Sequence, residues 1–263
     1  MVGARCSVEK TCLNFLTKSK SLAYLVFASS STIFSKIFSS IKSDMSNDLK
    51  TIYNAIAEEF SASRIFPWEE LQVFIPYIGD NFKVLDLGCG NGRLLKVLQE
   101  SGKKFDYLGI DFADNLIAEA KKQWSDFNFQ VGEMENLKLA PESFEMIFLI
   151  ASFHHLQNRK DRIKVLNNIY QALKPEGLLF MTNWDLRQKK YLKNFFSQWW
   201  KKRAWNDVFI SWQKYLGDKQ KLWRYYHSFT EGELESLLLQ TGFKLEPKGI
   251  YKTKWNINCL VKK

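Results

Sequence analysis

Three glycines, each separated from the next by one residue, mark the part of the chain best suited to bind a ligand: Gly88, Gly90 and Gly92. Glycine permits positive φ and lets a ligand approach the backbone where a Cβ atom would clash. The helix expected after them begins with unpaired N–H groups that can donate to a ligand. Asp86 precedes the glycines, and Asp111 follows about 20 residues later, where an acid contacts ribose hydroxyls in nucleotide-binding folds. The spacing predicts a cofactor site.

A second set of candidate residues is less regular in its spacing. Arg64 stands among hydroxyl and aromatic residues just before Pro67, which predicts a loop cation that either holds an anionic substrate or lies on the surface. His154 and His155 follow an apolar run at 144–151, where a parallel strand would end. Ligands bind beyond the carboxyl ends of such strands, so the histidines are either structural or face a substrate.

These residues need a fold that brings several strand ends together. Val84, Leu85 and Leu87 form a short branched run typical of a buried parallel strand, and strands and helices alternate after it. Further strands are expected at 107–111, 128–132, 144–151, 178–183, 244–251 and 256–261, and helices at 48–60, 68–78, 113–124, 158–173 and 231–240. The alternation predicts an α/β fold with a seven-stranded, mostly parallel sheet and helices on both faces.

The glycine segment DLGCGNG resembles the (D/E)xGxGxG motif of the class I S-adenosylmethionine-dependent methyltransferases, which have a Rossmann-like fold. The resemblance continues through Glu133 and Met134 and through the segments FEMIFLIASFHHL and LKPEGLLFM. It implies S-adenosylmethionine as cofactor, with Glu133 accepting from the adenine amino group and the Met134 N–H meeting a ring nitrogen. Many members have Asp where this chain has Glu133. The cofactor-binding residues implied are Asp86, Gly88, Gly90, Gly92, Asp111, Glu133, Met134 and Ala151. A nucleotide-type fold with a different or empty site is the alternative.

A narrower resemblance covers roughly residues 49–263. The segments YNAIAEEFSASRIFPW, HHL and RYYHSFTEGELESLLLQTGF, with the pair Asn183 and Trp184, are similar to the tRNA methyltransferases that esterify 5-carboxymethyluridine at the wobble position. The resemblance implies the anticodon loop of tRNA as substrate, a methyl ester as product and, as in eukaryotic members, a small zinc-binding activator subunit. The catalytic residues expected from it are Arg64 to hold the carboxylate, and His155 and Trp184 to orient and stack the base. Further candidates are His154, Tyr53 and Arg162.

An insertion at 187–224 carries much of the positive charge of the chain, which is +10 in total. It holds eleven basic residues against two acids and five of the nine tryptophans, Trp199, Trp200, Trp205, Trp212 and Trp223. Cations interleaved with aromatic rings favour contacts with phosphates and stacked bases of single-stranded RNA. Two alternatives stay open: helically spaced aromatics such as Trp205, Phe209 and Trp212 pack on the core, or the segment rests on a lipid interface.

Two other functions remain compatible with the sequence. One is a small-molecule or lipid-quinone methyltransferase that uses the insertion as a lid, and the other is a cofactor-binding protein without turnover. A small apolar substrate should give activity nearly independent of salt, whereas RNA should give a steep salt dependence.

Residues 1–44 differ in composition from the rest, with ten serines and a net charge of +4. This composition is typical of a disordered extension or of an organellar transit peptide, and translation starting at Met45 is the alternative. We therefore expect residues 45–263 to form the methyltransferase domain. The apolar run at 22–28, within the N-terminal segment, is too short to span a bilayer, so no stable membrane insertion is expected. The four scattered cysteines predict neither a metal site nor a disulfide framework, which favours a reducing, cytoplasmic location.

Overall fold

The computed structural model describes residues 48–64, 68–191, 194, 204–213 and 221–263. The predicted extension at 1–44 lies outside these residues, as do Trp199 and Trp200 of the insertion. Within the described ranges, no helix is both long enough and apolar enough to cross a membrane.

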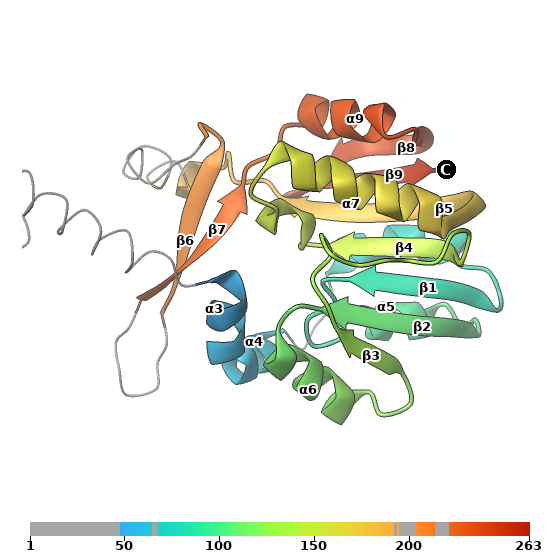
Figure 1. Ribbon diagram of the computed structural model, residues 1–263, viewed down its shortest axis with the longest axis horizontal. Helices are drawn as coiled ribbons and strands as arrows, with labels where there is room; N and C mark the ends of the chain where they lie inside the picture. Colours follow the sequence, from blue (N-terminus) through green and yellow to red (C-terminus); the bar gives the residue numbers. More distant parts are fainter. Residues whose placement is uncertain (1–47, 65–67, 192–193, 195–203, 214–220) are drawn as a thin grey trace, which may run out of the picture. The chain divides into compact units, whose positions relative to one another are not determined.

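A seven-stranded sheet forms the centre of the structure, in the order β3-β2-β1-β4-β5-β9-β8 (Figure 1). Its strands are β1 (Phe82–Leu87), β2 (Phe105–Asp111), β3 (Asn128–Val131), β4 (Phe144–Ile150), β5 (Leu173–Trp184), β8 (Lys244–Lys252) and β9 (Asn256–Lys262). The first five pair in parallel, whereas β9 is antiparallel to both β5 and β8. The predicted seven-stranded, mostly parallel sheet is confirmed.

Alternate residues of the central strands supply two separate cores, one on each face of the sheet. Leu85 and Leu149 belong to the core covered by α7 (Arg159–Ala172) and α9 (Glu231–Gln240). Val84 and Phe148 belong to the other core. That face is covered by η1 (Glu69–Tyr77), α5 (Leu94–Glu100) and α6 (Asp114–Gln123). Because both faces are buried, the strands read as nearly continuous apolar runs.

Helix boundaries follow local chemistry. Thr230 caps α9 by accepting from the N–H of Glu233 at 3.1 Å, and Asn158 caps α7 by accepting from the N–H of Asp161 at 2.9 Å. The helix predicted at 68–78 is a 3-10 helix, η1, with Pro76 inside it. Proline has no N–H to donate, which disfavours a regular α-helix at this point.

The helix predicted at 48–60 is two short helices, α3 (Leu49–Ala55) and α4 (Ala57–Ser63). The described part of the insertion forms a hairpin of β6 (Asp207–Gln213) and β7 (Lys221–His227). Phe209 and Trp212 therefore lie on a strand, so the helical interpretation of their spacing is wrong. The apolar residues of α3 and β7 share one cluster, in which Ile52, Tyr53 and Leu222 are buried (Figure 1).

Candidate active site

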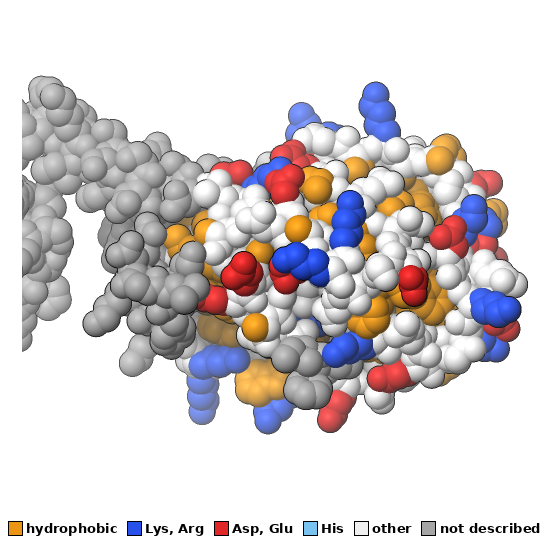
Figure 2. Space-filling model, turned by 90° about the horizontal axis from the view of Figure 1, so that it is seen from below, with side chains coloured by type: hydrophobic (Ala, Val, Ile, Leu, Met, Phe, Trp, Pro, Cys, Tyr) orange, Lys and Arg blue, Asp and Glu red, His pale blue; other side chains and the backbone are white. Residues whose placement is uncertain are grey.

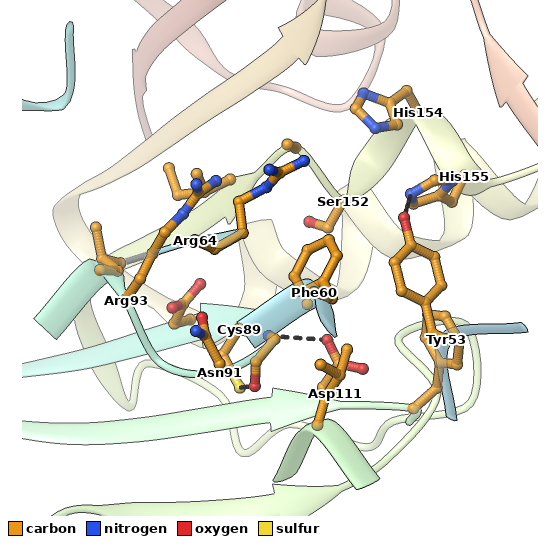
Figure 3. Close-up of a pocket in the computed structure, with 18 of the residues that line it drawn as sticks. Tyr53, Phe60, Arg64, Cys89, Asn91, Arg93, Asp111, Ser152, His154 and His155 are labelled. Atoms are coloured by element: carbon orange, nitrogen blue, oxygen red, sulfur yellow. Dashed lines mark hydrogen bonds between the residues drawn. The ribbon is translucent and has the colours of Figure 1, made fainter. Parts of the chain in front are cut away.

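A pocket lies at the carboxyl ends of β1, β2 and β4, with the glycine turn on one side and α3, α4 and β7 on the other (Figure 3). We call the part lined by residues of 86–111 and by Met134 the cofactor half. The part lined by Tyr53, Arg64, His155, Trp184, Arg224 and Tyr226 is called the substrate half.

The three glycines serve different purposes in the turn, although all have positive φ. A Cβ atom on Gly88 would lie 2.3 Å from the Cβ of Ser152, and one on Gly92 would lie 2.9 Å from Trp124. At Gly90 the nearest atom would be 3.7 Å away on Phe60, a pocket residue. Gly88 and Gly92 therefore permit close packing of the protein, whereas Gly90 leaves the pocket open to a ligand. Gly92 is not among the residues that line the pocket.

Asp111 ends β2 and fixes the shape of the turn. Its two carboxylate oxygens accept backbone N–H groups at 2.9 Å, one from Gly90 and one from Ala113 (Figure 3). Burial raises the pKa of Asp111 to about 6, although these two hydrogen bonds lower it. Each oxygen has a second lone pair, so the carboxylate can also accept from hydroxyl groups of a ligand.

Asp86, in β1, is 1% exposed and lines the same half. One oxygen accepts the hydroxyl of Tyr107 at 2.9 Å, whereas Oδ1 has no hydrogen-bond partner in the described part of the chain. Burial raises the pKa of Asp86 to about 7. Arg93 is half-buried nearby with its guanidinium 4.2 Å from the centroid of the Trp68 ring, and desolvation lowers its pKa to about 10. A buried carboxyl group with an unpartnered oxygen and a half-buried cation fit a zwitterionic group.

Two residues predicted to hold an adenine occupy different environments. Met134 is buried in the pocket wall with Leu116 of α6. Glu133 is exposed, accepts from the side chain of Asn136 at 2.7 Å and does not line the pocket. Its predicted contact with an adenine amino group stays a prediction that this placement does not support. Ala151 lines the pocket and has φ 53°.

Two arginines enter the substrate half from distant parts of the chain, Arg64 after α4 and Arg224 in β7. Burial lowers the pKa of Arg64, and the charge of Arg224 lowers it further, so the two guanidinium groups repel each other. In the described ranges, neither forms an ion pair with a carboxylate. Arg64 lies 5.1 Å from the Phe60 ring, and the Nε of buried Arg224 has no hydrogen-bond partner there. A cation removed wholly or partly from water is stabilised by an anion, so this half, with the buried Arg224 and the half-buried Arg64, is suited to bind one.

Both ring nitrogens of His155 are occupied by the protein. Nδ1 lies 2.8 Å from the backbone oxygen of Tyr225, which can only accept, so Nδ1 carries the proton. Nε2 then accepts from the Tyr53 hydroxyl at 2.9 Å (Figure 3). Burial lowers the pKa of His155 to about 3, so the ring is neutral at physiological pH. Arg224 in turn donates to the Tyr53 oxygen at 3.4 Å, which links the arginine to the histidine.

Trp184, at the end of β5, stacks on Tyr226 with ring centroids 5.1 Å apart and planes inclined by 15°. His154 is buried against both, and its Nδ1 accepts from the backbone N–H of Trp184 at 3.3 Å. Trp184 remains partly exposed and lines the pocket. The aromatic surface for a flat ligand is therefore made by Trp184 and Tyr226 together.

Sequence reasoning missed Arg224 and Tyr226 as site residues. Both belong to the segment RYYH, and alternation along β7 places them on one side of the strand, toward the pocket. Tyr225 and His227 point to the other side, where both contact Asp207. A strand assignment for this segment would have identified the inward residues.

Arg162, a further candidate, lies outside the pocket. Its guanidinium donates to the backbone oxygen of Leu156 and pairs with Glu233 at 3.4 Å. It therefore supports α9 and the 3-10 turn at Phe153–His155. In the described ranges, no group of three or more His, Cys, Asp and Glu side chains could hold a metal ion.

In a comparison with known proteins, residues 84–177 match the model of a methyltransferase domain. The tRNA (carboxymethyluridine(34)-5-O)-methyltransferase of Saccharomyces cerevisiae is 29% identical over 61% of this chain and 54% of its own length. The chain spans about half the length of this relative and of the one from Arabidopsis thaliana. Among solved structures, an S-adenosylmethionine-dependent methyltransferase from Methanosarcina mazei has a TM-score of 0.63 at 18% identity, covering 73% of this chain and 96% of that one.

A second solved structure is a complex from Haloferax volcanii between the Trm112 methyltransferase activator and a methyltransferase. It has a TM-score of 0.53 at 15% identity and covers 76% of this chain and 77% of that one. At these identities, both structures bear on the fold alone.

Proposed function

Since residues 84–177 form a methyltransferase domain, we propose that the chain uses S-adenosylmethionine to methylate the carboxylate of a 5-carboxymethyl-type wobble uridine in tRNA. The observation that carries the proposal is the pair of arginines in the pocket, the buried Arg224 and the half-buried Arg64, which have no described carboxylate partner. A substrate carboxylate supplies the missing anion. The name of the Saccharomyces cerevisiae relative supports this choice of substrate.

The cofactor half fits S-adenosylmethionine. The unpartnered Oδ1 of Asp86 suits the ammonium of the methionine part, and Arg93 suits its carboxylate. Asp111 keeps lone pairs for the ribose hydroxyls, and the open side of Gly90 gives the ligand access to the backbone. When bound, the cofactor supplies an electrophilic methyl group.

The substrate half needs to position the acceptor and exclude water. A carboxylic acid with a pKa of about 4 is ionised at neutral pH, so no general base is required. This agrees with a neutral His155 whose two nitrogens are already occupied. Arg64 holds the carboxylate, and Trp184 with Tyr226 offers a stacking surface for the base. Tyr53 and His155 act as positioning residues for Arg224 and for the wall of the pocket.

The partner requirement is a second part of the proposal. A small zinc-binding activator subunit is expected from the family resemblance, and the methyltransferase of similar fold from Haloferax volcanii is one that forms a complex with an activator. If such a subunit is needed, the chain purified alone should bind the cofactor yet transfer little methyl, and addition of the activator should restore transfer.

The test is methyl transfer from radiolabelled S-adenosylmethionine to tRNA prepared from cells that lack this protein, followed by nucleoside analysis. A base-labile label on a 5-carboxymethyluridine derivative is the expected result. Transfer to a metabolite extract instead of tRNA, with a flat salt dependence, would overturn the assignment in favour of a small-molecule methyltransferase.

A further inference from the structure

A groove next to the active site has the composition of a nucleotide-binding surface. It shares Arg64, Trp68 and Trp184 with the pocket and extends from them to the turn between β8 and β9. Because these three residues line both, the groove opens directly from the substrate half. We name it the side groove; beyond the shared residues, its wall includes Lys190, Lys254 and Trp255.

Trp255 is the aromatic surface of the side groove, and 48% of it is exposed. The exposed part of this indole lines the groove and offers an aromatic face on which a base can stack. The ammonium of Lys190 lies 4.1 Å from the centroid of this ring, and that of Lys254 lies 5.0 Å from it. Neither lysine forms an ion pair within the described ranges. The two ammonium groups lie over this ring, and their flexible side chains can meet the phosphates of a nucleotide whose base replaces them on the ring.

The turn that carries Trp255 is held rigidly. Glu70 of η1 accepts hydrogen bonds from the side chains of Thr253 and Asn256. The backbone oxygen of Lys254 accepts from Gln188 at 3.1 Å, and that of Trp255 accepts from the N–H of Asp185 at 2.9 Å. A surface fixed in this way loses little conformational entropy when a ligand binds.

Charge in the groove is arranged unevenly, which orients the ligand. Glu70 is committed to the turn, but Glu69 is exposed at the wall and repels phosphate. Phosphates are therefore expected on the side of Lys190 and Lys254. Over the face shown in Figure 2, Lys and Arg side chains are mixed with Asp and Glu, so that face offers no continuous basic surface.

From these contacts we infer that the side groove binds a nucleotide adjacent to the methylated one, with its base on Trp255 and its phosphates on Lys190 and Lys254. The inference rests on the proposed function only for the identity of the RNA. Single-stranded loops suit this mode of binding, because their bases are free to turn outward and stack on aromatic side chains.

The experiment measures the affinity of the full chain for a fluorescein-labelled anticodon stem-loop RNA by anisotropy. Trp255→Leu keeps apolar bulk but removes the aromatic face, and it should weaken binding about tenfold, whereas Trp255→Phe should keep most of the affinity. Lys190→Ala and Lys254→Ala should each reduce the slope of log affinity against log salt by roughly 0.7. Lys121→Ala, exposed on α6 away from the groove, is the matched control and should leave the slope unchanged.

Equal affinity of wild type and Trp255→Leu would overturn the inference, and so would absence of RNA binding by the wild type. Binding to anionic vesicles that depends on Trp255, with RNA binding unaffected by the substitution, would assign the surface to lipid instead. Methyl transfer is measured separately on the same proteins. If the wild type transfers no methyl to tRNA but Trp255→Leu still weakens RNA binding, the proposed function is wrong and the inference that the side groove binds RNA is supported.

Discussion

In the cofactor half of the pocket, the polar contacts come from one continuous stretch, 86–113, and run mainly between carboxylates and the backbone. The substrate half draws Tyr53, Arg64 and Arg224 from three elements far apart in sequence, and its contacts run between side chains. In the first half, the carboxylate of Asp111 already accepts backbone N–H groups, whereas the second half holds two cations that need an anion. Cofactor binding and substrate positioning should therefore respond to different substitutions.

The largest expected effect is on the substrate half. Arg64→Ala should lower kcat/KM for tRNA roughly a hundredfold, because a charge-assisted hydrogen bond contributes about 1.5–3 kcal/mol. The Kd for S-adenosylmethionine should stay near that of wild type. Steady-state kinetics and calorimetry measure the two quantities, with Arg159→Ala, which bonds Gln240 away from the pocket, as control. Equal losses in kcat/KM and in cofactor affinity would show that Arg64 serves both halves of the pocket and not the substrate half alone.

The complementary substitution is Asp111→Ala. It removes the carboxylate that holds Gly90 and Ala113, so cofactor affinity should fall about tenfold or more. Calorimetric titration of S-adenosylmethionine gives the Kd, and Asp114→Ala, which loses an exposed ion pair with Lys50 and an exposed hydrogen bond from Asn54, should bind normally. Unchanged affinity of Asp111→Ala would contradict the ribose assignment.

Cofactor affinity should also depend on pH. In the free protein the carboxyls of Asp86 and Asp111 take up protons as the pH falls through their pKa values of about 7 and about 6. Only the ionised forms suit an ammonium and accept hydroxyl groups at both oxygens, so affinity should fall as the pH is lowered from about 8 to about 5. Asp86→Asn should remove the part of this dependence near pH 7. A flat profile for the wild type would argue against ionised carboxylates in the site.

Tyr53→Phe tests the hydrogen bonds through which the Tyr53 hydroxyl links His155 to Arg224 within the substrate half. The substitution leaves Nε2 of His155 without a donor and Arg224 without its described side-chain acceptor, at nearly constant volume. We expect kcat/KM for tRNA to fall about fivefold to tenfold, because one buried hydrogen bond contributes about 1 kcal/mol. Tyr170→Phe, on α7, is a control outside the pocket. An unaffected Tyr53→Phe variant would show that this bond does not position Arg224.

The smallest expected effect concerns His227, on the side of β7 that faces away from the pocket. His227 lies between Asp207, at 3.5 Å, and Glu233, at 2.8 Å; its pKa is raised by hydrogen bonds to these two carboxylates, although burial lowers it. A histidine whose pKa is raised on folding stabilises the fold fully at a pH below its unfolded-state pKa of about 6.5. This contribution is lost as the pH rises through its pKa in the folded state. Between pH 6 and pH 9, the Tm of wild type should therefore fall by about 2–4 °C more than that of His227→Gln. Parallel Tm profiles would exclude the charged histidine as an anchor.

Much of the cofactor half could be predicted because its signals are local. The strand before Gly88, the glycines and Asp111 are close in sequence, and their backbone geometry depends on residue type. The same holds for α9, where Thr230 and Glu233 set the start of the helix. Glu133 shows the limit of motif transfer, since its side chain bonds Asn136 outside the pocket.

The sequence by itself determined the order of strands and helices, the glycine turn and the acid at the end of β2, because hydrophobic periodicity and glycine conformations are properties of short segments. Only the tertiary structure decided that Arg224 faces Arg64 and that Tyr53 occupies the free nitrogen of His155. It also decided that Trp255 borders the pocket through the side groove. These contacts join residues separated by up to about two hundred positions, and their pairing depends on how a hairpin packs against α3 and α4, which no local pattern encodes.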